Sequence, residues 1–374
     1  MLLFCEAHRD WMVAEITRLV RAESPSVDKE AVDRCGSILA AQLTGIGMRV
    51  ERIYQRTAGD HVRADTGSGP RQVLLLGHFD TVWPVGQLQR TPLRIDEDRL
   101  YGPGVFDMKA GVVLAMTAIR ALQDAHATRD CRLVMLWTSD EEVGSASSRA
   151  LIEEEARRSD AVLVLEPPLP GGAVKTARKG CAGYEVVVRG IAAHAGIEPE
   201  KGASAVEELA RQIPRINGFQ DRDGGLLVNV VQAWGGARSN VIPDEAHALV
   251  DVRLPDAQSW EKVQAAFAGL APVNARTTIE CRGWFDRPPL ERSDATVRLY
   301  HKARAVAAAL GRDLAEGSTG GGSDGNLTAA LGVPTLDGLG AVGDGAHAAH
   351  EHVVIPELPW RAALLAGLIR ELTG

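Results

Sequence analysis

The pattern of apolar and polar residues along the chain predicts continuously buried strands that alternate with helices. Strand-like apolar runs occur at 71–78, 131–139 and 161–167. Between the first two lies 107–125, a predicted helix with apolar residues on nearly every side, and 145–158 predicts another helix after the second run. Strands that are apolar on both faces and alternate with helices are typical of an α/β fold with a mostly parallel sheet and helices on both faces.

The middle of the chain has a different order of elements, β-α-β-β-α-β. Its strands are predicted at 183–190, 226–234, 247–254 and 275–283, and its helices at 202–216 and 256–270. This order is typical of a small split-βαβ, or ferredoxin-like, domain. We therefore predict one α/β domain formed by 1–181 and 289–374, with a second domain, 182–288, inserted into it.

Acidic and histidine side chains stand where the predicted strands end and where the helices begin. In chain order these positions are His78, Asp80, Asp107, Glu141, Glu142 and Glu166, and the segment "DGAHAAHEH" adds His347, His350 and His352. Folds of this class gather their ligands beyond the carboxyl ends of the strands. Any one of these residues could instead be a solvated loop group or a helix cap, as Asp107 could be for its helix. Five such residues at successive edges, namely His78, Asp107, Glu142, Glu166 and His347, favour a shared site.

Imidazole and carboxylate together are ligands for Zn²⁺ or for a similar ion such as Mn²⁺ or Co²⁺. Two ions need about six protein donor positions, and one carboxylate can bridge ions roughly 3.5–4 Å apart. Five residues provide them if Asp107 bridges: His78, Asp107, Glu142, Glu166 and His347. Glu141 then remains beside the metals as a candidate general base, because neighbouring side chains at a strand exit diverge. Asp80 is placed to accept the other N–H of the His78 ring.

Composition and charge exclude several other classes of function. A net charge of −8 over 374 residues gives no electrostatic reason to expect nucleic acid or an anionic membrane as a partner. No segment reaches the roughly 18 uninterrupted apolar residues of a spanning helix, and charged residues interrupt the N-terminal apolar run, unlike a secretory signal. Five cysteines, odd in number and widely spaced, predict reduced thiols in a cytoplasmic protein.

The segments that carry these residues resemble the signatures of a known family. "LLLGHFDTVWPVG", "YGPGVFDMKAG", "TSDEEVGS", "LEP" and "GAHAAHE" are similar, in order and spacing, to those of the co-catalytic zinc carboxypeptidase and aminoacylase family. That family includes glutamate carboxypeptidase, acetylornithine deacetylase, succinyl-diaminopimelate desuccinylase and peptidase T. The resemblance runs from about residue 70 to the end, and Glu166 is typical of the glutamate carboxypeptidase and desuccinylase branch.

The resemblance implies a role for each edge residue. Asp107 would bridge two Zn²⁺ ions, with Co²⁺ or Mn²⁺ as possible substitutes. Glu142 and His347 would complete the coordination of one ion, and His78 and Glu166 would complete that of the other. Glu141 would be the general base and Asp80 the residue that orients His78. The choice of His347 rests on the family's "AHxxxE" frame, so His350 and His352 are expected to be surface or supporting groups. The family often has a cis peptide after the bridging aspartate, here Asp107-Met108.

The resemblance also suggests residues for substrate binding. His194 matches a histidine of the inserted domain that reaches the partner subunit's site and steadies the oxyanion, although it could simply cap a loop. Arg253 lies where members often bind a carboxylate, but it could equally form an ion pair within its strand. Asn240 is a similar candidate. Gly321 and Gly322, in "STGGGSDGN", lie before a probable short helix and could bind an anion through backbone N–H groups, or form a flexible turn.

These implications together predict a reaction. We expect a cytoplasmic metal-dependent hydrolase that cleaves the amide bond of an N-acyl amino acid or small peptide with a free C-terminal carboxylate. A metal-bridged water would attack, and Glu141 would take its proton. The residues 182–288 would serve as a lid and dimerisation domain, so a homodimer is expected. The alternatives are a biosynthetic deacylase acting on acetylornithine or succinyl-diaminopimelate, and a non-catalytic binding protein of the same fold.

Overall fold

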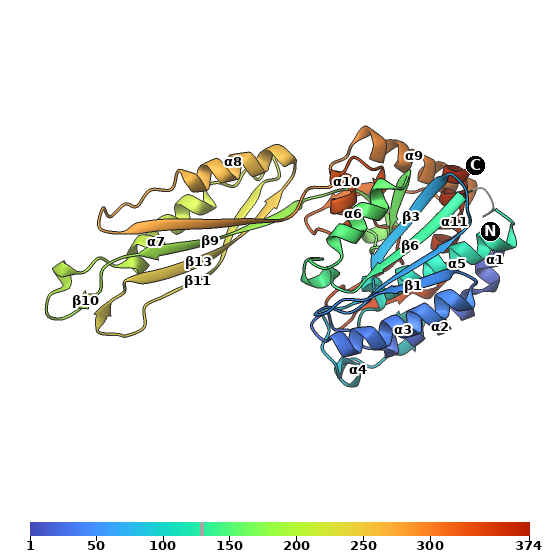
Figure 1. Ribbon diagram of the computed structural model, residues 1–374, viewed down its shortest axis with the longest axis horizontal. Helices are drawn as coiled ribbons and strands as arrows, with labels where there is room; N and C mark the ends of the chain where they lie inside the picture. Colours follow the sequence, from blue (N-terminus) through green and yellow to red (C-terminus); the bar gives the residue numbers. More distant parts are fainter. Residues whose placement is uncertain (128–130) are drawn as a thin grey trace. The chain divides into compact units, whose positions relative to one another are not determined.

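The computed structural model describes residues 1–127 and 131–374, which form two compact units. The first unit contains 1–177, 292–319 and 323–374, and the second contains 178–291 with 320–322 (Figure 1). The limits predicted for the inserted domain, 182 and 288, differ slightly from these. Within the described ranges, no helix has both the length and the apolar character needed to cross a membrane.

The first unit is built on a six-stranded sheet. Its strand order is β1 (Arg49–Ile53), β2 (His61–Thr66), β6 (Cys131–Thr138), β3 (Arg71–His78), β7 (Ala161–Val164) and β16 (Thr335–Leu336). The four strands β6, β3, β7 and β16 are parallel to one another, whereas β2 is antiparallel to both β1 and β6. The predicted mostly parallel sheet is therefore confirmed, with an antiparallel pair added at one edge.

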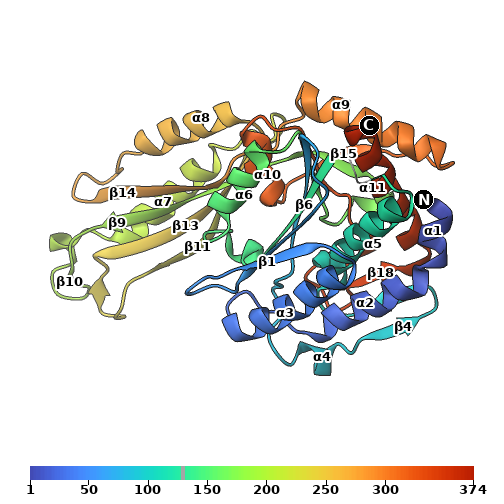
Figure 2. The ribbon, with the colours of Figure 1, turned by 45° about the vertical axis from the view of Figure 1, so that its right-hand side comes forward.

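Helices cover both faces of this sheet (Figure 2). The helices of the unit are α1 (Leu2–Ala7), α2 (Arg9–Arg21), α3 (Lys29–Gly45), α4 (Gln87–Arg90), α5 (Ala110–Asp124), α6 (Arg149–Arg157), α9 (Asp294–Ala309), α10 (Asp324–Ala330) and α11 (Leu358–Thr373). On β3, Leu74 and Leu76 pack in a cluster with residues of α6 and α10. Val73 and Leu75 point the other way, into a larger cluster with residues of α5 and α11. Alternate residues of one strand thus enter two cores, which explains its continuous apolar sequence.

Short strands complete the first unit. Their bounds are β4 (Arg94–Asp96), β5 (Arg99–Tyr101), β8 (Val174–Arg178), β15 (Glu316–Thr319), β17 (Gly343–Asp344) and β18 (His352–Val354). They form a four-stranded sheet in the order β17-β18-β5-β4 and a pair, β15-β8. The first of these sheets ties the His347 segment to the segment that leads into Asp107.

The second unit has the predicted ferredoxin-like order of elements. Its elements are β9 (Gly180–Arg189), β10 (Ala193–His194), α7 (Ala205–Asn217), β11 (Leu227–Gly235), β12 (Val241–Ile242), β13 (Glu245–Leu254), α8 (Ala257–Ala268) and β14 (Thr278–Arg287). The main sheet has the order β11-β13-β9-β14, and every neighbouring pair is antiparallel. Residues of α7 and α8 share one hydrophobic core with three of its strands, β9, β11 and β13. The split-βαβ prediction is confirmed.

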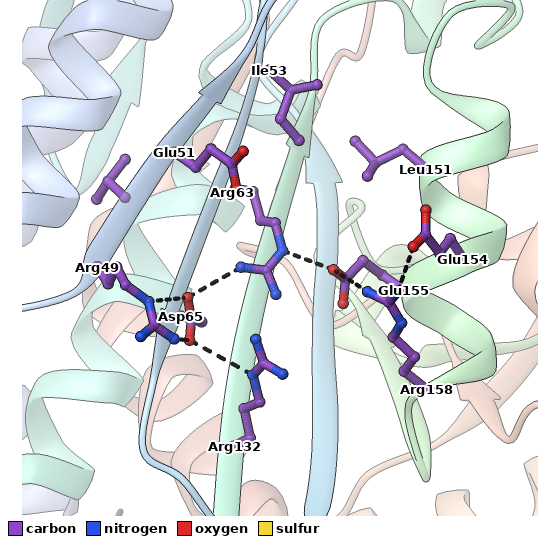
Figure 3. A pocket seen from close by; sticks show the side chains of 11 residues that line it. Arg49, Glu51, Ile53, Arg63, Asp65, Arg132, Leu151, Glu154, Glu155 and Arg158 are labelled. Atoms are coloured by element: carbon purple, nitrogen blue, oxygen red, sulfur yellow. Dashed lines mark hydrogen bonds and ion pairs between the residues drawn. The ribbon is translucent and has the colours of Figure 1, made fainter.

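A cavity of about 620 Å³ lies beside the antiparallel edge, over residues of β1, β2, β6 and α6 (Figure 3). Four arginines and four acidic residues line it, so their formal charges cancel, and none of the predicted site residues is among them. Arg63 lies between Asp65 and Glu155, donating from Nη1 to Asp65 at 3.1 Å and from Nε to Glu155 at 2.7 Å. Arg49 donates to the same Asp65 carboxylate. Ion pairs between arginine and carboxylate thus connect β1, β2 and α6 across this cavity.

We expect Asp65→Asn to destabilise the fold in a pH-dependent manner. Burial would raise the pKa of Asp65, but the arginines hold this pKa below its usual range. Asp65 therefore adds stability above the unfolded pKa of about 3.9, and that stability is lost as the pH falls through the folded value. The difference in unfolding free energy between wild type and variant should be about 2 kcal/mol at pH 7 and shrink below about pH 4. Urea unfolding across this range measures it, with the exposed Glu154→Gln as the matched control. A difference that is constant with pH would contradict the prediction.

Candidate metal centre and active site

The predicted ligands stand at the ends of elements in the first unit. His78 is the last residue of β3, Glu142 lies in a short turn, Glu141–Val143, directly after β6, and Glu166 follows β7. Because these three strands are parallel neighbours, their carboxyl ends meet at one edge of the sheet. Asp107 lies in the turn that leads into α5, and His347 follows β17.

These five side chains form two groups that share Asp107. His78, Asp107 and Glu166 make one group, and Asp107, Glu142 and His347 make the other, with the ligand atoms of each group within 4.8 Å of one another. In the first, His78 Nε2 lies 3.2 Å from Asp107 Oδ1 and 3.3 Å from Glu166 Oε1. In the second, His347 Nε2 lies 3.5 Å from Asp107 Oδ2 and 3.2 Å from Glu142 Oε2. Each group thus uses a different oxygen of Asp107.

These separations fit a pair of divalent cations. Ligand atoms about 2.0–2.1 Å from a tetrahedral Zn²⁺ are about 3.4 Å from each other, close to the four distances in the two groups. Asp107 Oδ1 is buried and accepts no hydrogen bond of good geometry from the residues described. A buried carboxylate oxygen without a donor is costly unless a cation approaches it. The donor set, two imidazoles and three carboxylates, is also the one that such ions prefer.

The pKa values in the two groups reflect the same excess of negative charge. Hydrogen bonds to Asp107 and Glu142 raise the pKa of His347 to about 10. Burial would lower the pKa of His78, but the carboxylates of Asp107, Asp80 and Glu166 raise it well above its usual value. Burial would raise the pKa of Asp107, but the two histidines hold it below its usual range. The carboxylates thus favour positive charge at this position, which divalent cations would supply.

The backbone around Asp107 and His347 departs from ordinary geometry. The Asp107-Met108 peptide is cis, as the family resemblance implied. His347 has a φ of +61°, in the left-handed region that few residues other than glycine adopt. Gly111, the second residue of α5, lies so close to the sheet that an added Cβ would sit 2.2 Å from the Leu165 carbonyl oxygen. Glycine at this position therefore lets α5 pack directly beside the strand exit that carries Glu166.

Asp80 connects the His78 segment to the loop that carries Glu141 and Glu142. The fully buried Asp80 carboxylate accepts the backbone N–H groups of Glu141 and Glu142, each at 3.3 Å. His78 Nδ1 lies 3.0 Å from the Asp80 carbonyl oxygen and 3.4 Å from its Oδ1, so the main chain is the nearer acceptor for the imidazole. Glu141 belongs to neither metal group but is the direct neighbour of Glu142.

Sequence reasoning missed two residues that support these loops. Ser26 donates its hydroxyl to Asp80 Oδ2 at 2.6 Å, and nothing in the local sequence indicates this. Glu351 is buried and accepts hydrogen bonds from the turn that carries Asp107. Its position in the "AHxxxE" frame was the only available signal.

The other two histidines of the "HAAHEH" segment lie outside both metal groups. His350 is exposed, whereas His352 is buried in β18, where its ring lies 5.0 Å from that of Tyr101. His352 Nδ1 is 2.9 Å from the carbonyl oxygen of His350. These positions agree with the prediction that both are surface or supporting groups.

Two candidates for substrate binding lie side by side in the second unit. His194 pairs with Val241 in the small β10-β12 sheet, and the Asn240 carbonyl oxygen accepts the N–H of Ala195 at 3.0 Å. Both His194 and Asn240 are exposed. The His194 ring accepts the backbone N–H of Gly196 on Nδ1 at 3.1 Å, which leaves Nε2 as the nitrogen that can carry the proton.

The remaining candidates, Arg253, Gly321 and Gly322, also belong to the second unit. Arg253 donates from Nε to Asp251 at 3.0 Å and from Nη1 to the Cys181 thiol at 2.8 Å. The ion pair within its strand, one of the two alternatives expected for Arg253, is therefore present and uses one side of the guanidinium. Arg178 Nη1 donates to the carbonyl oxygens of Gly321 and Gly322, at 3.2 Å each. The predicted short helix is α10, but its first N–H groups are engaged by Ser323 and its side-chain capping box. Anion binding at these glycines would therefore depend on the loop rather than on the helix start.

The sequence is similar to a known family and to named proteins. Residues 74–371 match the family described as "Peptidase family M20/M25/M40". The chain is 32% identical over 373 residues to carboxypeptidase G2 of Pseudomonas sp. (strain RS-16), covering 96% of this chain and 89% of that protein. It is 28% identical over 358 residues to succinyl-diaminopimelate desuccinylase of Xanthomonas campestris pv. campestris (strain B100), covering 90% and 93% of the two chains.

Solved structures have the same fold. Aminopeptidase PepT of Bacillus cereus ATCC 10987 superposes with a TM-score of 0.80 at 22% identity, covering 98% of this chain and 99% of that one. The YxeP protein of Bacillus subtilis, described as a dinuclear metal binding peptidase from the M20 family, gives a TM-score of 0.72 at 15% identity, with 98% and 99% coverage. The family match covers most of the chain and includes every predicted metal ligand. The chain is therefore a metal-dependent hydrolase that belongs to the M20/M25/M40 peptidase family.

Proposed function

We propose that this chain is a di-zinc enzyme of the carboxypeptidase type, which hydrolyses the amide bond of an N-acyl amino acid or small peptide with a free C-terminal carboxylate. The observation that carries the proposal is the sharing of Asp107. One oxygen lies 3.2 Å from His78 Nε2 and the other 3.5 Å from His347 Nε2, as expected of a carboxylate that bridges two ions. Zn²⁺ suits this donor set, and Co²⁺ or Mn²⁺ are the expected substitutes.

In this proposal the chain's own residues hold the site and move the proton. Bound divalent cations supply Lewis acidity, which polarises the scissile carbonyl and lowers the pKa of water. Glu141 accepts the proton of the attacking water and passes it to the leaving nitrogen. Asp80 orients Glu141 and Glu142 together through their backbone N–H groups. His194 donates from Nε2 to the developing oxyanion.

The second unit is proposed to select the substrate. Arg253 would recognise the free carboxylate with the part of its guanidinium that Asp251 and Cys181 leave available. Asn240, Gly321 and Gly322 would add polar contacts, and the adjacency of Asn240 to His194 supports a joint role for these two. The 32% identity to a protein named carboxypeptidase G2 favours C-terminal glutamate as the first amino acid to test.

A panel of substrates tests the proposal directly. Zinc-loaded protein is incubated with N-acyl amino acids and dipeptides that differ in the C-terminal residue, and the released amino acids are identified. We expect release from substrates with a free carboxylate, loss of release after chelation, and recovery when Zn²⁺ is added back. Equal release from C-terminal amides would contradict carboxylate recognition, and full activity after complete chelation would contradict the metal mechanism.

A biosynthetic deacylase is the second candidate. The 28% identity to succinyl-diaminopimelate desuccinylase over nearly the whole chain favours including that substrate and acetylornithine in the panel. Faster cleavage of either, relative to N-acyl glutamate, would select this alternative. The metal chemistry would be the same in both cases, because it depends on the first unit alone.

We also propose that the chain forms a homodimer through its second unit and acts in the cytoplasm. The support for a dimer is the family resemblance of the segment around His194, which would act in the partner subunit's site. Mixing a His194→Ala variant with a Glu141→Gln variant tests this by complementation. Recovered activity in the mixture supports action of His194 in trans. If the subunits are shown to exchange and no activity returns, action in trans is contradicted.

A further inference from the structure

Glu351 is a buried acidic residue that the mechanism above does not use. Its side chain is 2% exposed and belongs to neither metal group. Its carboxylate accepts four hydrogen bonds, three of them from the backbone of the turn that contains Asp107. Burial raises its pKa, and the backbone donors oppose this effect. Such a concentration of donors on one carboxylate needs an explanation beyond ordinary packing.

We propose that Glu351 is a positioning residue, which holds the Asp107 turn so that both oxygens of Asp107 face the two metal positions. The proposal rests on the proposed function, since it assumes that Asp107 bridges two ions. Glu351 follows His347 by four residues, so one short segment supplies a ligand for the second group and the acceptor that fixes the shared ligand. The metal positions would therefore be assembled together when this segment folds against the turn.

The hydrogen bonds are divided evenly between the two carboxylate oxygens. Oε1 accepts the N–H groups of Phe106 and Asp107, at 2.9 and 3.0 Å. Oε2 accepts the N–H of Gly104 and the indole N–H of Trp83, both at 2.8 Å. The carboxylate thus fixes the turn on both sides of Phe106 and connects it to the loop after β3. An ionised acceptor makes each of these bonds stronger than a neutral one would.

This division makes glutamine a poor replacement, although it has the same shape. A carboxamide has one acceptor oxygen and one NH₂ group, which is only a donor. In either orientation, the NH₂ group would face two N–H donors and leave them without an acceptor. A buried donor left unsatisfied costs free energy, and the turn can relieve that cost by moving away. Movement of the turn displaces Asp107 from both metal positions at once.

The test is a metal titration of Glu351→Gln. Apo protein is titrated with Co²⁺, and binding is followed by the visible absorption of the bound ion together with competition by a chelator. Wild type should bind two ions. In the variant we expect the affinity for both ions to fall by about 10- to 100-fold, the usual effect of removing a group that orients a metal ligand. The absorption spectrum should change as well, because the oxygen geometry around both ions changes.

Two further variants separate positioning from general stability. Glu208→Gln is the matched control, because Glu208 is 1% exposed and accepts the backbone N–H groups of Val273 and Asn274 in the second unit. It should lower the melting temperature without changing Co²⁺ affinity or spectrum. Trp83→Phe removes one of the two hydrogen-bond donors to Oε2 and should slightly lower the affinity for both Co²⁺ ions. Combined with Glu351→Gln, it should restore part of the lost affinity, because only the Gly104 N–H then opposes the NH₂ group.

The outcomes are distinct. Wild-type affinity for both ions in Glu351→Gln, or loss of only one ion, would overturn the positioning role. If Glu351→Gln does not fold, an unchanged affinity of Trp83→Phe for both ions would overturn it. If wild type itself fails to bind two ions, the proposed dinuclear function fails first, before any variant is compared. The proposal is supported if Glu351→Gln lowers the affinity for both Co²⁺ ions and the double variant recovers part of that affinity.

Discussion

Glu141→Gln is expected to lower kcat for amide hydrolysis by about 10²- to 10⁴-fold while both metal positions remain filled. Glu141 belongs to neither metal group, so its replacement removes the proposed proton acceptor without removing a proposed ligand. Glutamine keeps the shape and the backbone N–H that donates to Asp80 at 3.3 Å. The measurements are steady-state hydrolysis of the best panel substrate and elemental analysis of the purified protein.

The adjacent residue provides the matched control. Glu142→Gln is the same substitution one position later, but Glu142 is within 3.2 Å of His347 Nε2 in the second metal group. This variant should lose affinity for one ion, and added metal should recover part of its activity. Added metal should not rescue Glu141→Gln. Hydrolysis by Glu141→Gln at the wild-type rate would remove the general-base assignment.

Asp107→Asn is expected to lower the affinity of the protein for both ions together. Activity should fall by roughly 10³-fold or more, because the several kcal/mol by which bound metals stabilise the transition state would be lost. Asparagine has one oxygen where Asp107 uses two, one toward His78 and the other toward His347. Binding of Co²⁺ should fall from two equivalents to fewer than one at concentrations that saturate wild type.

A variant of a ligand that is not shared gives the comparison. His347→Ala should leave the group of His78, Asp107 and Glu166 intact and retain one equivalent of metal. His350→Ala, a neighbouring exposed histidine outside both groups, should retain two. If Asp107→Asn and His347→Ala lose the same single equivalent, Asp107 is not a bridge.

The ends of the buried strands could be predicted because the sequence changes abruptly there. His78, Glu142 and Glu166 each follow an apolar run, and a parallel sheet brings the ends of such runs to one edge. The same reasoning identified the ferredoxin-like order of the second unit from its alternating strands and helices. Local pattern is therefore sufficient where burial on both faces dictates the sequence.

The pattern was less informative where a strand or helix lacks a simple polar face. β1 and β2 were not predicted, because "RVERI" and "HVRADT" carry charges, of which Arg63 and Asp65 pair with each other. α11 was not predicted either, since nearly all its residues are buried and no polar stripe marks its outer face. Even its Arg361 is fully buried and donates to the carbonyl oxygens of Gly340 and Gly172.

Supporting contacts were the hardest part of the site to predict. Ser26 donates to Asp80, which is 54 residues away in the sequence, and Glu351 accepts from Asp107, which is 244 residues away. A serine in a loop or a glutamate among histidines has many solvated alternatives, so its residue type carries little information. Only the folded geometry indicates that each completes the hydrogen bonding of a functional loop.

The first unit contributes all five proposed ligands, together with Glu141 and Asp80. The candidates for substrate recognition belong to the second unit. In the proposed mechanism, metal binding and proton transfer thus belong to the first unit, whereas substrate choice and the oxyanion contact of His194 belong to the second. We expect mutations within 178–291 that spare His194 to change the range of accepted amides, while the five proposed metal ligands and Glu141 remain in place.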